Sequence, residues 1–160
     1  MVGIHGLLGV GKTTITKAVY NIIDNCFDWS CFLENVRENL GIDAGIIKLQ
    51  EQLLNDILGN GNWRVGSKFR GISLVKERLC RKKLSLILDD VDDLTRIENF
   101  LGKCNWFAPG SIIITLRDRH LLAALKENVW TTSKVKEFKF EQLNEHEAIQ
   151  LLKETWWRLF

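Results

Sequence analysis

Residues 6–13 read Gly6-Leu7-Leu8-Gly9-Val10-Gly11-Lys12-Thr13, which fits the pattern G-x-x-x-x-G-K-T. Val2 to Ile4, just before this stretch, has the apolar character of a short buried strand. From Lys12 onward the chain reads as an amphipathic helix, with an apolar face predicted to carry Ile15, Ala18, Val19, Ile22 and Ile23. A strand, a glycine-rich turn and a helix in this order aim several backbone N–H groups at one point, which is typical of a phosphate-binding loop (P-loop). The alternative is an ordinary glycine turn in front of a helix.

Each residue type in this loop suits a nucleoside triphosphate. The glycines let the backbone approach the phosphates without a Cβ in the way. Lys12 supplies a positive charge for the β- and γ-phosphates, and the hydroxyl of Thr13 can bind Mg²⁺. We therefore predict that the chain binds ATP or ADP with Mg²⁺, and that the loop residues involved are Gly6, Gly9, Val10, Gly11, Lys12, Thr13 and Thr14.

A metal-binding partner for the loop follows further along the chain. Residues 84–90 read Leu-Ser-Leu-Ile-Leu-Asp-Asp, a mostly apolar run that ends in two carboxylates. Such a run predicts a buried parallel strand, and open α/β sheets bind ligands at the carboxyl ends of their strands. Asp89 is predicted to hold the Mg²⁺ ion, as a Walker B residue does. Asp90, one residue further, is the candidate catalytic group that orients or deprotonates the attacking water. The alternative is a strand that ends in an acidic turn.

A third strand is predicted at residues 111–118, which read Ser-Ile-Ile-Ile-Thr-Leu-Arg-Asp. It delivers Arg117 at its C-terminal end, where a guanidinium can contact the γ-phosphate and so distinguish ATP from ADP. A nucleotide switch requires such a differential contact. The alternative is a surface arginine that pairs with Asp118 or Asp92.

These motifs and the segments between them resemble one family, the NB-ARC nucleotide-binding domain of plant disease-resistance proteins. Five blocks are similar to those of the family and stand in the family's order. They are GIHGLLGVGKTT at 3–14, FDWSCFLENVRE at 27–38, LDDVD at 88–92, PGSIIITLRD at 109–118 and FEQLNEHEA at 140–148. The resemblance covers nearly the whole chain.

Two features resemble one subclass of that family. Asp92 closes its block where the coiled-coil class usually has Trp, and the block at 32–37, Phe-Leu-Glu-Asn-Val-Arg, is the form found beside Toll/interleukin-1 receptor (TIR) domains. The resemblance implies a cytoplasmic or nuclear receptor, with a TIR domain and leucine-rich repeats as its partners and self-association on activation. Residues 1–160 would be part of an NB-ARC nucleotide-binding subdomain that lacks an upstream adenine-side segment and the downstream helical and winged-helix parts.

The resemblance also implies what the site does. ADP would hold the resting state, and exchange for ATP would release the receptor to signal in the defence response. Mg²⁺-dependent hydrolysis would be slow, because Asp90 is shorter than the Glu that fast relatives carry at this position. Two alternatives stay open: a turnover ATPase or phosphotransferase that uses the same loop, and a degenerate interaction module that no longer binds nucleotide.

Three features of the sequence depart from the family pattern. Leu8 stands where the family has a small residue, so we expect a bulky side chain to strain the loop or narrow the site. The block at 109–118 lacks the Arg that usually follows Gly-Ser, and its second Thr is replaced by Leu116. These last departures bear on strand register and on nucleotide sensing. Arg37 belongs to a family block, but the sequence assigns it no contact.

Composition agrees with one α/β domain. The chain has 46% hydrophobic residues and a net charge of +2 with the two signs interspersed, so it shows no nucleic-acid-binding footprint. No apolar run reaches the roughly 18 residues of a membrane span. The four cysteines lack paired C-x-x-C spacing and are expected to be free thiols in a reducing cytosol: Cys26, Cys31, Cys80 and Cys104.

Strands and helices are predicted to alternate along the chain, as a parallel sheet requires. Further strands are expected at 31–36 and 134–140, and helices at 44–58, 72–81, 94–101, 120–125 and after Asn144. The predicted fold is an α/β P-loop NTPase with three layers (α-β-α) and a mainly parallel five-stranded sheet. The resemblance implies that the strand carrying Arg117 lies between the P-loop strand and the strand that ends in Asp89.

Overall fold

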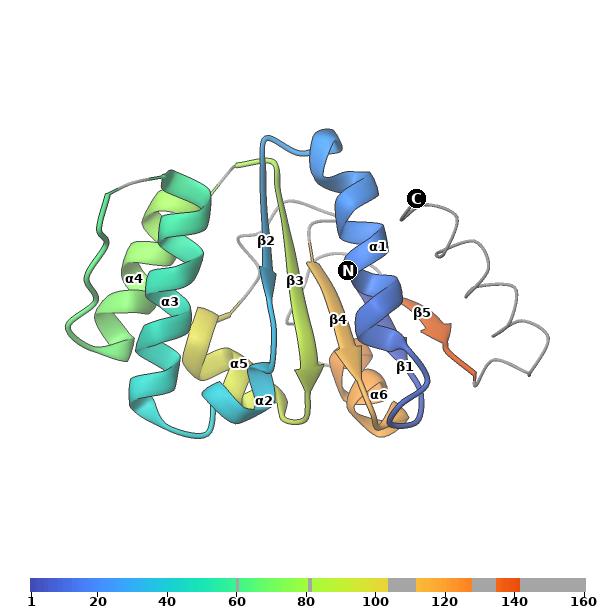
Figure 1. Ribbon diagram of the computed structural model, residues 1–160. Helices are drawn as coiled ribbons and strands as arrows, with labels where there is room; N and C mark the ends of the chain where they lie inside the picture. The colour runs from blue at the N-terminus through green and yellow to red at the C-terminus, as the bar shows by residue number, and fades with distance from the viewer. Residues whose placement is uncertain (60, 81, 104–111, 128–134, 142–160) are drawn as a thin grey trace.

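A computed structural model describes residues 1–59, 61–80, 82–103, 112–127 and 135–141 (Figure 1). Its centre is one five-stranded sheet with the order β2-β3-β4-β1-β5, in which every pairing is parallel. The strands are β1 (Val2–His5), β2 (Trp29–Leu33), β3 (Leu84–Val91), β4 (Ile112–Leu116) and β5 (Lys136–Lys139). The helices are α1 (Lys12–Ile23), α2 (Val36–Asn39), α3 (Asp43–Leu58), α4 (Lys68–Leu79), α5 (Leu94–Leu101) and α6 (Arg119–Glu127).

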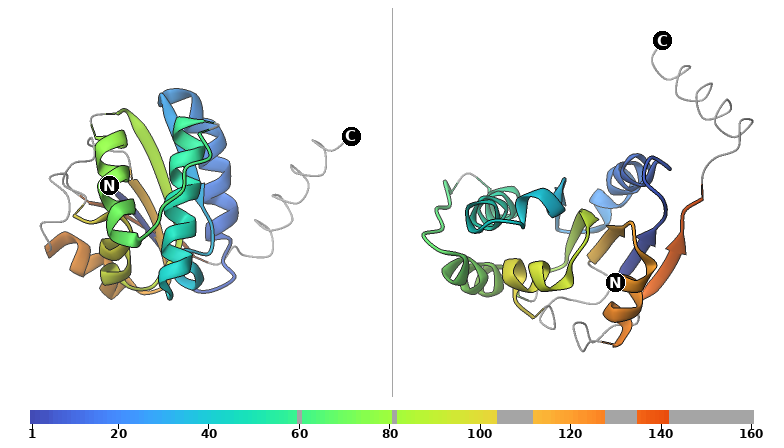
Figure 2. Two further views of the ribbon diagram at one scale, coloured as in Figure 1. Left: turned by 90° about the vertical axis from the view of Figure 1, so that its left-hand side faces the viewer. Right: turned by 90° about the horizontal axis from the view of Figure 1, so that it is seen from below.

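Helices cover both faces of the sheet, so the fold has the three layers that the sequence predicts. α1 lies against one face, and α6 lies on the opposite face (Figure 2, right). Side chains alternate along β3: Ile87 belongs to the cluster beneath α1, whereas Leu86 and Leu88 belong to the larger core shared with α3, α4, α5 and α6. This two-sided burial explains why β3 and β4 are continuous apolar runs in the sequence.

The order of the central strands is the one implied by the family resemblance. β4 lies between β3 and β1, and its register against β1 pairs Ile4 with Thr115 and His5 with Leu116. All three strands are parallel, so their C-terminal ends meet at one edge of the sheet. The P-loop, Asp89 and Arg117 each follow or end one of these strands and are therefore brought together.

The predicted apolar face of α1 is largely wrong. Val19 and Ile23 pack against the sheet as expected, but Ile15, Ala18 and Ile22 are exposed. The stripe that faces the sheet contains Thr16 instead, which is fully buried and donates from its Oγ1 to the Lys12 carbonyl at 2.6 Å. A buried threonine that satisfies its hydroxyl within its own helix reads as polar in a hydropathy pattern, which misplaces the face.

Other element boundaries differ by a few residues. β2 begins at Trp29, two residues earlier than predicted, and ends at Leu33, three residues earlier; the short helix α2 follows. α4 begins at Lys68 instead of residue 72, because Ser67 caps it by accepting from the Arg70 N–H at 3.4 Å. α5 has the bounds that the sequence predicts. The predicted helix after Asn144 lies outside the described residues.

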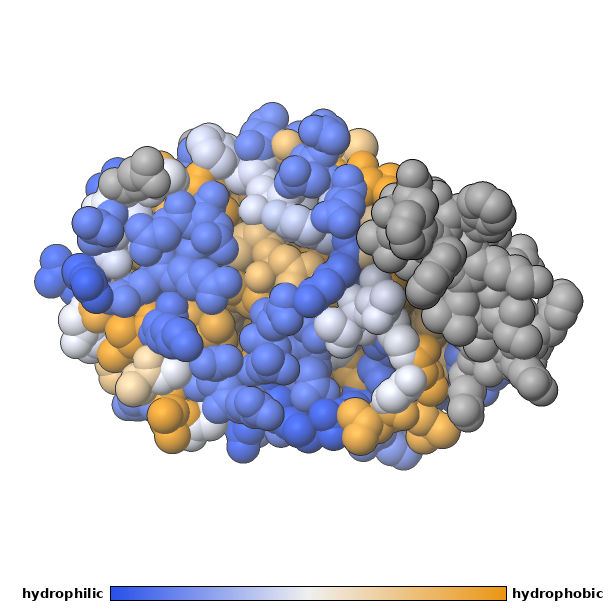
Figure 3. Space-filling view, in the orientation of Figure 1, coloured by the Kyte–Doolittle hydropathy of each residue, from blue (hydrophilic) through white to orange (hydrophobic). Residues whose placement is uncertain are grey.

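The surface of the sheet-covering layers is largely polar. Figure 3 shows hydrophilic residues over most of one face, with hydrophobic residues at its lower edge where the β1–α1 loop lies. Cys26 and Cys80 are exposed and Cys31 is buried, and all three are free thiols. Among the described residues, no helix is both long and apolar enough to cross a membrane.

Candidate nucleotide-binding site

A cavity of about 360 Å³ opens where the C-terminal ends of β1, β3 and β4 meet. It is lined by residues from the P-loop, from the ends of these strands and from the β2–α2 connection. The lining residues are Leu8, Gly9, Gly11, Lys12, Thr13, Thr14, Asn35, Asp89, Asp90, Thr115 and Arg117. The structure therefore gathers most of the predicted site residues around one space. The two predicted loop residues that do not line the cavity are Val10, whose side chain is buried, and Gly6, at the start of the loop.

The P-loop backbone forms an open cradle. Gly9 and Gly11 have left-handed φ angles of +80° and +90°, and a Cβ placed on either would meet nothing within 4 Å. Gly11 occupies the N-cap of α1 without a side-chain cap, and its carbonyl accepts from the Ile15 N–H at 3.0 Å. The N–H groups of the first helical turn thus have no acceptor within the helix. This arrangement of free amides and open space fits a phosphate group.

Lys12 is folded back onto its own loop. Its Nζ donates to the carbonyls of Gly6 and Leu7, both at 2.7 Å. Burial lowers the pKa of Lys12, and the nearby Arg117 lowers it further, whereas Asp90 opposes the shift. The ammonium group therefore lies among backbone acceptors at the cavity wall, from which it can transfer to a phosphate oxygen.

Asp89 is held by two hydroxyl groups. Its Oδ2 accepts from Thr13 Oγ1 at 2.8 Å, and its Oδ1 accepts from Thr115 Oγ1 at 2.6 Å. The carboxylate is buried, so these hydrogen bonds fix its orientation in the cavity wall. A threonine hydroxyl and a carboxylate oxygen side by side are the oxygen ligands that Mg²⁺ prefers. The donor set of Thr13 and Asp89 thus fits a magnesium ion that phosphate oxygens complete.

Thr115 is a site residue that the sequence analysis missed. Besides holding Asp89, its Oγ1 accepts from the Asp90 N–H at 2.8 Å. The signal was present, because Thr115 is the hydroxyl residue in an otherwise apolar β4 strand. The role of Thr115 follows from its position opposite Asp89 and Asp90, and that position depends on the register between β3 and β4, which the sequence alone does not give.

Asp90 lies in a β-bulge. Leu88 pairs with Ile114 and Val91 pairs with Leu116, so Asp89 and Asp90 together oppose Thr115. Asp90 has a left-handed φ of +61°, which is uncommon for a non-glycine residue. The bulge turns consecutive carboxylates toward the same cavity, whereas a regular strand would direct them to opposite faces of the sheet.

Arg117 pairs with Asp90 through two contacts. Its Nε donates to Asp90 Oδ1 at 2.8 Å and its Nη2 to Asp90 Oδ2 at 2.9 Å. The partners considered from the sequence are engaged elsewhere: Asp118 accepts from the His120 N–H at the start of α6, and Asp92 pairs with Arg96. Arg117 is thus at the cavity wall and in an ion pair at the same time.

The β2–α2 connection adds two residues that sequence reasoning left without a role. Asn35 has a left-handed φ of +52°, occupies the N-cap position of α2 and lines the cavity. Arg37 then directs its Nε toward Asp90 Oδ2 at 3.4 Å. Asparagine is one of the residues that tolerate the left-handed region, which is the sequence signal for such a turn.

The expected strain at Leu8 is not observed. Its side chain is 73% exposed, and its φ lies outside the left-handed region that non-glycine residues avoid. Leu8 lines the cavity, and most of its side chain is exposed to solvent. Leu116 is fully buried and pairs with Val91 and His5, so it belongs to the core and to the β4 pairings on both sides.

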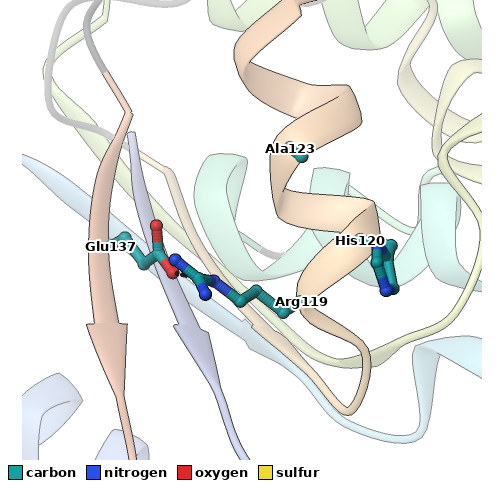
Figure 4. A pocket seen from close by; sticks show the side chains of 4 residues that line it. All are labelled: Arg119, His120, Ala123 and Glu137. Carbon is teal, nitrogen blue, oxygen red and sulfur yellow. Dashed lines mark hydrogen bonds and ion pairs between the residues drawn. The ribbon is translucent and has the colours of Figure 1, made fainter.

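A second cavity of about 260 Å³ lies between α6 and β5 and is lined by Arg119, His120, Ala123 and Glu137. Figure 4 shows the side chains of Arg119 and Glu137 pointing toward one another, while His120 points away. The Oε1 of Glu137 lies 3.0 Å from Arg119 Nε and 3.0 Å from the buried His5 Nε2. This carboxylate ties α6 and the end of β1 to the strand β5.

A parallel sheet, a glycine loop before α1 and paired carboxylates at the end of β3 define the class of P-loop NTPase domains. Within that class, the chain belongs to the NB-ARC family, because residues 1–158 match the model of the NB-ARC domain. Both the fold class and the family expected from the sequence are confirmed.

Curated relatives are plant proteins named for disease resistance. The chain is 44% identical over 125 residues to disease resistance protein RPV1 of Vitis rotundifolia, covering 77% of this chain and 9% of the relative. It is 43% identical over 128 residues to disease resistance protein RUN1 of the same plant, covering 79% and 10%. It is 36% identical over 152 residues to disease resistance-like protein DSC1 of Arabidopsis thaliana, covering 94% and 12%. The chain thus spans about a tenth of the length of these relatives.

Proposed function

We propose that this domain is an ADP/ATP-operated switch of an intracellular plant immune receptor. The observation that carries the proposal is the ion pair between Arg117 and Asp90 beside the phosphate cradle. An arginine that already has an anionic partner can exchange that partner for the γ-phosphate, and only ATP offers one. Membership of the NB-ARC family and the similarity to disease resistance proteins support the receptor context.

The nucleotide is proposed to bind through its phosphates first. The amides of the P-loop surround the phosphate oxygens, and Lys12 Nζ exchanges the Gly6 and Leu7 carbonyls for them. Thr13 and Asp89 would hold Mg²⁺, and the hydrogen bond from Thr115 keeps Asp89 in orientation. When bound, the ion supplies positive charge that offsets the charge of the phosphates.

Arg117 then distinguishes the two nucleotides. With ADP bound, nothing competes for the guanidinium, and Arg117 stays paired with Asp90. With ATP bound, the γ-phosphate competes with Asp90 for the same donors. Because ATP and ADP then favour different arrangements of one side chain, the site can shift a conformational equilibrium.

Slow hydrolysis follows from the same ion pair. In the structure both Asp90 oxygens accept hydrogen bonds from Arg117, so an attacking water molecule would have to compete with the guanidinium for this carboxylate. When Arg117 turns to the γ-phosphate, that competition ends at Asp90 Oδ1, the oxygen that Arg37 does not approach. The side chain of Asp90 is also one methylene shorter than that of Glu, so its carboxylate would lie farther from the attacking water.

In the whole receptor, the switch is proposed to act on a TIR domain and leucine-rich repeats in the cytoplasm or nucleus, with self-association in the ATP state. Binding titrations with ATP and ADP in Mg²⁺, combined with steady-state phosphate release, test the switch directly. We expect saturable binding of both nucleotides and phosphate release far slower than one turnover per second. Fast turnover would favour an ATPase or phosphotransferase, and absence of binding would favour a degenerate interaction module.

A further inference from the structure

We propose that Arg37 is a positioning residue for the switch: it holds Asp90 when Arg117 leaves for the γ-phosphate. This inference rests on the proposed function and adds a regulatory residue to it. The two arginines approach Asp90 from different elements, Arg37 from α2 and Arg117 from the end of β4. Asp90 therefore has a second cation in place before the first one departs.

The two contacts are unequal. Arg117 makes two hydrogen bonds at 2.8 and 2.9 Å, whereas the nearest Arg37 atom, Nε, lies 3.4 Å from Asp90 Oδ2. The side chains of Arg37 and Asp90 are 35% and 22% exposed, so their attraction is only partly screened by water. In the structure Arg117 is therefore the principal partner of Asp90, and Arg37 is the weaker, second partner.

The backbone around Arg37 is fixed from two sides. Val36, the first residue of α2, is fully buried and anchors the turn. The Arg37 carbonyl accepts from Arg96 Nη1 of α5 at 3.3 Å, and the same Nη1 lies 3.3 Å from Asp92 Oδ2. Asp92, which the sequence singled out as a mark of the TIR subclass, thus acquires a role: it holds Arg96 against the turn that presents Arg37.

Asp90 is itself unable to follow Arg117. It sits in the bulge with its N–H bonded to Thr115 and its φ in the left-handed region, so its carboxylate stays near the end of β3. Departure of Arg117 would leave that carboxylate half-buried beside the buried Asp89 carboxylate, with no cation in contact apart from Arg37 among the ion pairs of the described residues. Arg37 therefore lowers the free energy of transferring Arg117 to the γ-phosphate.

The consequence is specific for ATP. Binding of ADP leaves the pair of Arg117 and Asp90 undisturbed, so the loss of Arg37 has little effect on it. Binding of ATP includes the transfer of Arg117, and that step becomes harder when Asp90 has no second partner. Arg37 thus adjusts the preference for ATP over ADP without contacting either nucleotide.

The test is a set of titrations of the purified protein with ATP and with ADP in Mg²⁺. For Arg37→Ala we expect ATP affinity to fall about three- to fivefold, as loss of a partly screened ion pair implies, and ADP affinity to change less than about twofold. Arg37→Lys keeps the charge and should recover part of the ATP affinity. Asp92→Ala should shift ATP in the same direction by a smaller factor. Arg64→Ala, at an exposed arginine outside the cavity lining, is the matched control.

A double mutant separates this role from the alternatives. In an Asp90→Asn background, Arg37 has no carboxylate to hold, so Arg37→Ala should have no further effect on the affinity for ATP. A persistent loss there would show that Arg37 contacts the nucleotide itself, and equal losses for ATP and ADP would show a merely structural role. Either result overturns the inference. Arg117→Ala, measured alongside, tests the proposed function separately, because that function fails if this variant does not discriminate between the nucleotides.

Discussion

At the scale of single residues, the site is a set of polar side chains that already have partners within the protein. Lys12 is bonded to two loop carbonyls, Asp89 to two hydroxyls and Asp90 to Arg117. Under the proposed function, a nucleotide with Mg²⁺ would replace these partners. Burial of these polar groups is tolerated because each of them is hydrogen-bonded.

Replacement of Lys12 tests the phosphate cradle. Lys12→Ala removes a charge-assisted contact to the phosphates, worth about 1.5–3 kcal/mol, so the affinity for both ATP and ADP should fall about ten- to a hundredfold. Isothermal titration calorimetry measures both affinities, and thermal unfolding checks that the variant is folded. Equal affinities for variant and wild type would remove Lys12 and the P-loop from the binding site.

The two neighbouring carboxylates are expected to differ in their response. Asp89→Asn should weaken nucleotide binding about tenfold in the presence of Mg²⁺ and much less in EDTA, because one metal ligand loses its charge. Asp90→Asn is the matched control, since it should leave Mg²⁺-dependent ADP binding nearly intact and slow hydrolysis. Titration of both variants with and without the metal decides the assignment. If the two phenotypes are exchanged, the roles given to the two sides of the bulge are reversed.

At the scale of elements, the helices α3, α4 and α5 are joined by one buried amide. Gln50 is fully buried, and its Nε2 donates to the carbonyls of Lys68 at 3.0 Å and Phe100 at 2.8 Å. Gly71 on α4 gives this side chain room, because a Cβ there would collide with the Gln50 amide. The close packing of α3 against α4, which supports β3 and α2, thus requires a glycine at position 71.

Gly71→Ala should therefore destabilise the protein. Overpacking a tight core contact costs about 1–3 kcal/mol, and this contact also disturbs two buried hydrogen bonds. Urea unfolding followed by circular dichroism measures the change in the free energy of unfolding. Gly66→Ala is the control, because a Cβ at Gly66 meets nothing within 4 Å. Similar stability of the two variants would show that α3 and α4 separate more easily than the structure indicates.

The element scale also shows what a sequence can and cannot predict. The apolar runs of β3 and β4, the P-loop and the capped helix α5 follow from local patterns, and each was predicted. The bulge at Asp89 and Asp90 was not predicted, because it depends on how β3 aligns with β4. The short helix α2 was not predicted either, because it is held by a contact between Arg37 and Arg96, which lie far apart in the chain. The contribution of Thr115 was missed for the same reason.

At the scale of the whole molecule, three neighbouring parallel strands supply the residues of one candidate site. β1 leads into the phosphate cradle, β3 supplies the carboxylates, and β4, which lies between them, supplies Thr115 and Arg117. The proposed shift of Arg117 from Asp90 to a γ-phosphate would therefore change contacts at the junction of all three strands. The proposed receptor would read this shift through the elements that pack on that edge of the sheet.

The central claim is that Arg117 distinguishes ATP from ADP, and the affinity ratio of Arg117→Ala for the two nucleotides tests it most directly. Since only ATP offers a γ-phosphate to the guanidinium, the variant should lose about 1–2 kcal/mol of binding free energy for ATP, or about five- to thirtyfold in affinity, and little for ADP. Titration with both nucleotides in Mg²⁺, with Arg64→Ala as the control, gives the ratio. A loss by the same factor for ATP and ADP would contradict the account, because the switch would then lack its discriminating residue.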